Sequence, residues 1–224
     1  MVPFAKVAFP VRFPLAPACL LASVVALGGC ASRGEIDATG GITAVRSACP
    51  AVAIPASTGD VTLFDPAGST DAAAIDVSAT MTDVRSTCDD SGVQVHTAVT
   101  FTVLATRMRT GAARDVTLPY FLAVVQGGTA VVAKRVGQVT LHFDAGQRRA
   151  QVAGRAAAQV DRAAATLPPE IRERLTRKRK AGEEDAATDP LSAPDVRQAV
   201  LRASFEALVG FQLTDAQLRY NATR

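Results

Sequence analysis

Few side chains in this sequence are suited to metal or nucleophilic chemistry. The chain holds two histidines and four cysteines among its 224 residues. His96 and His142 fall at polar-face positions of expected strands. Two such histidines can meet across a sheet and bind a metal, but no Cys, Asp or Glu stands at ligand spacing from either. We therefore expect two surface or interface histidines, and we predict no metal site.

Other constellations of reactive residues are equally sparse. Asp83, Asp89 and Asp90 gather near Cys88. These carboxylates could bind calcium, but they lack the alternating oxygen ligands and the fixed glycine of an EF-hand loop. A solvated turn is the expectation there. Nucleophilic catalysis needs a serine or cysteine activated by a positioned base, and no G-x-S-x-G elbow occurs. We assign no catalytic residue and no cofactor.

The most suggestive surface feature is a run of four cations, Arg177, Lys178, Arg179 and Lys180. Such a run can dock on anionic lipid headgroups or wall polymers, at about 1 kcal/mol per cation near an anionic surface. The acidic run at residues 183–185 follows at once and can neutralise the cations. Cations at a helix C-terminus are also favourable without any ligand. The sequence leaves docking and a solvated helix end open, and favours the solvated end.

A leader precedes the rest of the chain. Lys6 and Arg12 are the only charges before Arg33, and the apolar run 15–27 has the length of a signal-peptide core. Small residues close this run. The motif Leu27-Gly28-Gly29-Cys30 resembles the lipobox of bacterial lipoproteins.

The resemblance implies cleavage between Gly29 and Cys30, a lipid on the Cys30 thiol and acylation of the new amino terminus. Two or more acyl chains anchor a protein stably in a membrane. Because Asp after the cysteine retains lipoproteins in the inner membrane, Ala31 favours the periplasmic face of the outer membrane. The alternatives are a secretory signal cut elsewhere and an uncleaved N-terminal anchor, which Pro14 and Pro17 weaken.

The cysteine count then predicts a disulfide. Cys19 leaves with the signal peptide and Cys30 carries the lipid, so Cys49 and Cys88 remain. Paired cysteines in an oxidising envelope are expected to form a disulfide. The alternative is two unpaired buried thiols.

Composition agrees with one exported globular domain. Removing residues 1–29 leaves 195 of the 224 residues, with 22 basic side chains (24 less Lys6 and Arg12) against 21 acidic ones. A single domain is the expectation for this length. The nearly balanced charge excludes the electrostatic pattern of a nucleic-acid binder. We expect a flexible tether over residues 30–47 and one β-rich domain over residues 48–224.

The hydrophobic period in that domain is two, which predicts strands. Residues 126–129 have hairpin-turn chemistry, and Pro119 indicates an edge strand or a bulge. Residues 147–160 are ambiguous between strand and helix, and we favour the strand. The predicted strands cover residues 60–64, 75–82, 93–103, 116–125, 130–143 and 205–213.

A helical and mobile insertion is expected at about 166–204. Thr166 is placed to cap a helix that runs through the basic cluster to about Gly182. Residues 181–193 are polar, and residues 195–204 form a second helix. Thr214 and Gln217 have capping-box spacing for a last short helix.

Together these elements predict a mainly β protein: an antiparallel sandwich with short C-terminal helices, of immunoglobulin-like or fibronectin-like architecture. The function we expect is a non-enzymatic accessory or binding subunit, anchored in the bacterial cell envelope and facing the periplasm. Its partners would be the membrane and an envelope protein or wall polymer. The alternative is an envelope hydrolase or small-ligand carrier whose site is not visible in the sequence.

Overall fold

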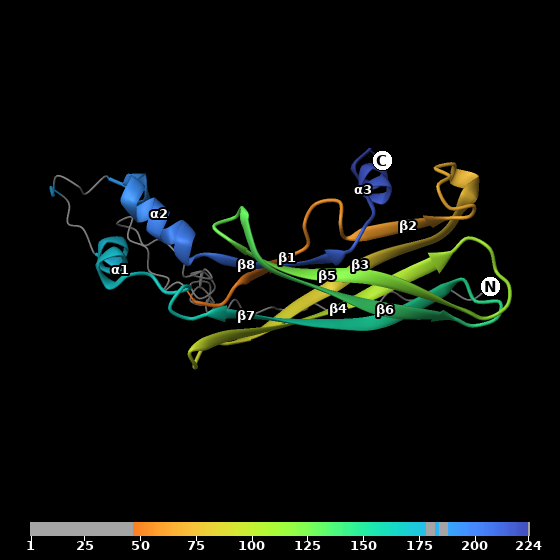
Figure 1. The fold of residues 1–224 in the computed structure, drawn as a ribbon, viewed down its shortest axis with the longest axis horizontal. Helices are drawn as coiled ribbons and strands as arrows, with labels where there is room; N and C mark the ends of the chain where they lie inside the picture. Colours follow the sequence, from red (N-terminus) through yellow and green to blue (C-terminus); the bar gives the residue numbers. More distant parts are fainter. Residues whose placement is uncertain (1–46, 178–181, 184–187, 224) are drawn as a thin grey trace, which may run out of the picture. The chain divides into compact units, whose positions relative to one another are not determined.

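Eight strands in two four-stranded sheets make up about half of the described chain, in a computed structural model (Figure 1). The structure describes residues 47–177, 182–183 and 188–223. The predicted signal peptide, the predicted lipidation site Cys30 and nearly all of the predicted tether lie outside these residues. The prediction of a mainly β sandwich with short C-terminal helices is confirmed.

The first sheet has the strand order β2-β3-β4-β7 and is antiparallel throughout. Its long β3 is bulged between Thr82 and Arg85, where Asp83 has a positive φ of 51°. The segment 147–160, ambiguous in the sequence, is a strand in this sheet and pairs with β4 along its whole length. The strands are β2 (Asp60–Phe64), β3 (Ile75–Asp89), β4 (Gln94–Arg107) and β7 (Arg149–Asp161).

The second sheet has the order β1-β8-β5-β6, and its short first strand runs parallel to β8. The β5–β6 hairpin turns through Gly127 and Gly128, which have φ values of 63° and 77°, as the sequence predicts. The strands are β1 (Ala51–Ala53), β8 (Phe205–Phe211), β5 (Arg114–Gln126) and β6 (Ala130–Phe143).

Among the described strands the chain changes sheets at four connections: β1 to β2, β4 to β5, β6 to β7 and β7 to β8. Gly146 takes the left-handed conformation, with φ 75°. However, the turn that contains it joins strands of different sheets. Turn chemistry specifies a local reversal, and it does not specify which sheet the next strand joins. Three consecutive strands, β2 to β4, share one sheet, unlike the ABED and CFG sheets of the immunoglobulin fold.

The prediction of an edge strand from Pro119 is corrected, because β5 is an inner strand between β8 and β6. The bulge in this hairpin lies at Val124 and Val125, away from the proline. Pairing of β5 with β8 ends at Tyr120 and Phe211, one residue after Pro119 along β5. The missing N–H of Pro119 therefore falls where β8 has ended, and no ladder bond between these strands is lost.

Inward-facing side chains of both sheets form one apolar core. On β4 the alternate residues from Val95 to Ala105 are buried, and on β6 Val139, Leu141 and Phe143 are buried. Valine is the commonest buried side chain of this core, and aromatic residues are few, as expected from a sequence with 5% aromatic residues. Burial of a valine or leucine side chain is worth about 1.5–3 kcal/mol, so this alternation holds the two sheets face to face.

Two aromatic–glycine pairs pack between the sheets, each with its glycine on a terminal strand. Phe101 on β4 lies opposite Gly154 on β7, and Tyr120 on β5 lies opposite Gly137 on β6. A Cβ atom at Gly154 would come within 2.3 Å of the Phe101 ring, and one at Gly137 within 2.6 Å of the Tyr120 ring. The two rings meet edge to face between the sheets, with centroids 5.0 Å apart. Each ring therefore fills the space that its partner glycine leaves.

The helices form a small second cluster. Ile171 and Leu175 of α1 (Pro169–Thr176) and Val196 of α2 (Pro194–Ala203) are buried in it. Figure 1 shows α1 and α2 beside each other, on the connection from β7 to β8. The last helix, α3 (Asp215–Thr223), begins with the predicted capping box: Thr214 N donates to Gln217 Oε1 at 2.9 Å, and Gln217 N to Thr214 Oγ1 at 3.3 Å.

Candidate functional site

The predicted disulfide joins Cys49 to Cys88. Cys49 lies just before β1 of one sheet, and Cys88 is the penultimate residue of β3 in the other sheet. The bond therefore connects the two sheets where the chain enters the fold. Its sequence separation of 39 residues corresponds to roughly 4 kcal/mol of stabilisation on the chain-entropy estimate.

The two histidines lie on different sheets, and each is exposed. His142 on β6 is directly opposite Asp115 on β5, with Nδ1 2.6 Å from Asp115 Oδ1, and its Nε2 is 3.5 Å from Asp144 Oδ1. The hydrogen bond with Asp115 raises the pKa of His142 above its ordinary value; desolvation opposes it, and the charges of Asp115 and Asp144 support it. The arrangement favours a surface imidazolium.

His96 on β4 lies between Asp89 on β3 and Gln159 on β7. These residues line a shallow depression of about 300 Å³ around the end of the β3–β4 hairpin. Hydrogen bonds donated by the backbone and hydroxyl of Ser91 lower the pKa of Asp89. Cys88 also lines the depression, but its sulfur is in the disulfide. No three potential metal ligands come together anywhere in the described part of the chain.

Helix α1 ends earlier than predicted, and this changes the setting of the basic cluster. Its last residue is Thr176, and Arg177 has extended backbone. The cluster therefore begins after the helix and is not its last turn. The start of α1 also differs from the prediction that Thr166 caps it. The N-cap is Pro168, which has no side-chain hydrogen bond, and the Thr166 hydroxyl donates to Arg162 O.

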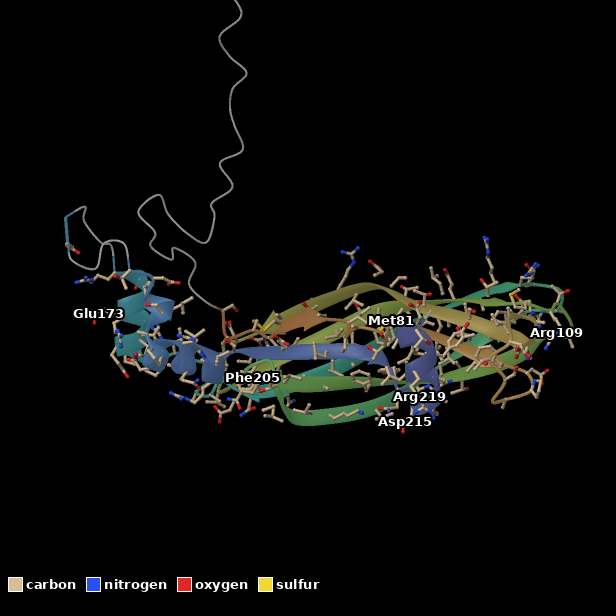
Figure 2. The ribbon with its side chains drawn as sticks, turned by 90° about the horizontal axis from the view of Figure 1, so that it is seen from above. Met81, Arg109, Glu173, Phe205, Asp215 and Arg219 are labelled. Atoms are coloured by element: carbon tan, nitrogen blue, oxygen red, sulfur yellow. A yellow bond between two sulfur atoms is a disulfide. The ribbon has the colours of Figure 1, made fainter. Side chains whose placement is uncertain are left out.

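Arg177 is the one member of the cluster within the described residues; Lys178, Arg179 and Lys180 lie outside them. Its guanidinium is 3.6 Å from Glu183. Arg174, in the preceding turn, pairs with Asp195, and this contact lowers the pKa of the Asp195 carboxyl. Figure 2 shows Glu173 of α1 in this helical part of the chain. Arg174 and Arg177 thus both face carboxylates of the same chain.

A second depression, of about 330 Å³, lies between α1 and the segment before α2. Its lining mixes both charges and short polar side chains: Glu173, Arg174, Arg177, Thr188, Asp189, Pro190, Ser192 and Ala193. Thr87 and Thr97 line the first depression beside His96, but among the described residues no hydroxyl or thiol is hydrogen-bonded to a histidine. Both surfaces can contact a partner, and neither has the enclosed apolar shape typical of a small-molecule pocket.

The sequence prediction missed Arg107, the largest fully buried side chain among the described residues, with 1% exposed. Its guanidinium lies against the ring of Phe143, 5.5 Å from the centroid, and donates four hydrogen bonds to backbone carbonyls of the β4–β5 and β6–β7 connections. The acceptors are Gln147 O (2.6 Å), Ala112 O (2.9 Å), Asp144 O (2.9 Å) and Gly111 O (3.3 Å).

The signal for this residue was present in the sequence. Arg107 lies two residues after Ala105 and four after Val103, on the same face of β4, so the alternation of the strand points its side chain inward. A buried cation satisfied by carbonyls alone fixes loop geometry. We therefore assign Arg107 a structural role, holding together the segments 108–113 and 144–148.

No protein-family model, no curated protein and no solved structure matches this chain. Within the described residues no helix is long and apolar enough to cross a membrane. A functional assignment therefore depends on the sequence motifs and on the geometry of these surfaces.

Proposed function

We propose that the chain is a lipoprotein of the bacterial cell envelope, anchored through Cys30, whose folded domain is a non-enzymatic binding subunit. In this proposal the lipid holds the protein at the periplasmic face of the outer membrane. The segment between Cys30 and Cys49 connects the lipid to the sandwich.

The pairing of cysteines is the observation that carries the proposal. The lipobox motif accounts for Cys30, and the two remaining cysteines of the mature chain are joined to each other. Disulfides of this kind persist in oxidising compartments such as the bacterial periplasm. The structural disulfide and the sequence motif thus support the same compartment by independent routes.

The sandwich supports binding over catalysis. In the described residues His142 contacts carboxylates, and no hydroxyl or thiol nucleophile is hydrogen-bonded to it or to His96. Long strands with exposed polar faces instead provide broad surfaces. An accessory subunit that recognises another envelope component is the function that these features favour.

The test is a substitution of the lipidated cysteine. Cys30→Ser is expected to block processing, because the modifying enzyme acts on the thiol, and to leave a larger precursor without a fatty-acid label. Cys19→Ser, within the leader, is the matched control and should mature normally. Metabolic labelling and immunoblotting of membrane fractions provide the readout. A Cys30→Ser protein that is still cut after Gly29 and labelled would refute the proposal.

A further inference from the structure

The first half of β6 is an exposed strand at the edge of its sheet. Every residue from Ala130 to Val136 is exposed, whereas the partners Leu122 to Val125 on β5 are buried. Successive strand residues point to opposite faces, so this stretch is exposed on both faces. Three valines here have large exposed fractions: Val131 63%, Val132 51% and Val136 59%.

The backbone edge of this stretch is unpaired within the described chain. β6 is the terminal strand of the order β1-β8-β5-β6, and its one ladder is with β5. A terminal strand presents a row of N–H and C=O groups that can pair with another chain. Short length and proline protect many natural edges, but β6 has 14 residues and no proline.

The charges around residues 130–136 indicate which kind of strand can pair with this edge. Lys134 and Arg135 lie in the middle of the exposed stretch, and β6 contains no acidic residue. The neighbouring edge strand β7 adds Arg149 and Arg155, and its one acidic residue is Asp161 at its end. None of these four cations takes part in an ion pair among the described residues. Lys134 lies instead over the Phe121 ring, 5.1 Å from its centroid.

A second copy of this chain is the less suitable occupant. Antiparallel pairing of two β6 edges about Lys134 would place the Lys134 side chains of both copies directly opposite each other, and pairing about Arg135 would do the same for Arg135. Like charges facing each other across a strand pair are destabilising. The same cations therefore disfavour self-association and favour a partner strand that carries carboxylates.

We propose that residues 130–136 of β6 are a docking edge, to which an extended acidic and β-branched segment of another envelope protein adds a strand. In such strand addition, main-chain hydrogen bonds provide affinity and alternate side chains provide specificity. Here the valines supply apolar contact, and Lys134 and Arg135 pair with the carboxylates. The docking edge specifies the class of partner for the binding subunit proposed above. This inference therefore rests on the proposed function.

The probe is a synthetic peptide of alternating valine and glutamate, about eight residues long, added to the full mature chain in detergent micelles. Binding is measured by fluorescence anisotropy and by amide hydrogen exchange. We expect slower exchange in residues 130–136 and affinity that falls with added salt, because exposed charges are screened. Arg135→Glu should weaken binding about tenfold. The matched Arg219→Glu change, on α3 (Figure 2), should leave binding unchanged.

Two further ligands distinguish strand addition from charge attraction alone and from membrane binding. The same peptide with N-methylated alternate residues keeps its charges but loses main-chain donors, and it should fail to bind. Equal binding of the methylated peptide would overturn the proposal, as would protection outside β6. So would binding only to anionic phospholipid vesicles, or concentration-dependent dimers without peptide. Fatty-acid labelling at Cys30 reports separately, so failure at the edge leaves the lipoprotein proposal intact.

Discussion

Arg107 shows how one side chain can organise the end of a sandwich. Its hydrogen bonds reach two of the connections that change sheets, β4–β5 and β6–β7, and its backbone N–H donates to Arg148 O. A carbonyl left without a donor in a buried position costs about 1–3 kcal/mol. The donors of the guanidinium are fixed in a plane, so this group can satisfy several such carbonyls at once. A lysine ammonium cannot.

Arg107→Met should therefore lower the free energy of unfolding by about 3–4 kcal/mol, since several carbonyls lose their donor together. Arg107→Lys should recover less than half of this loss. The measurement is urea unfolding followed by circular dichroism.

Arg109→Met is the control, two residues along the chain. Arg109 pairs with Asp65 at the surface, and Figure 2 shows it at the edge of the strands. Removing an exposed pair costs about 0–1 kcal/mol. Equal losses in the Arg107→Met and Arg109→Met variants would contradict the structural role of Arg107.

At the scale of elements, the strands were predictable and the helix ends were not. Alternation over β4 and the Gly127-Gly128 turn are local signals, and both appear in the structure. The end of α1 at Thr176 has no such local signal, because the first glycine after it in the sequence is Gly182. The role of Arg107 depends on segments distant in sequence, which periodicity does not relate.

The early end of α1 bears on the basic cluster. Replacing Arg177, Lys178, Arg179 and Lys180 by Gln is expected to leave retention on anionic vesicles and isolated wall unchanged, because Arg177 already pairs with Glu183. An unlipidated chain starting at Ala31 is compared with this variant at low and high salt, with Arg219→Gln as control. A docking cluster would instead lose about 1 kcal/mol per cation, seen as a salt-dependent drop in retention.

At the scale of the whole molecule, topology was the part that the sequence did not specify. The sequence predicts two layers because alternating strands must bury one face. It does not predict that β7 joins β4 rather than β6, since that choice depends on pairing such as Phe101 opposite Gly154. The Cys49–Cys88 pair was predictable by elimination, but its position between the two sheets was not.

Removing this disulfide should destabilise the molecule by about 3–4 kcal/mol, because the unfolded chain regains the freedom of a 39-residue loop. Cys49→Ser and Cys88→Ser should have the same effect, and a reductant should bring the wild type to that level. Urea midpoints with and without reductant give the comparison. Non-reducing mass spectrometry of envelope-derived protein should find the two peptides linked, and alkylatable thiols at both positions would disprove the bond.

The aromatic–glycine pairs impose a joint constraint on sequence change. The Phe101 ring occupies the volume that a side chain at Gly154 would need. A substitution at either position therefore depends on the residue at the other. A larger residue at 154 becomes acceptable only when residue 101 is smaller, and the same holds for Gly137 and Tyr120. The two rings also touch each other, so substitutions at four positions on four strands are mutually conditional. At these four positions a change in the volume of one side chain must therefore be matched by an opposite change in its partner, while residues on the outer faces can be substituted one at a time.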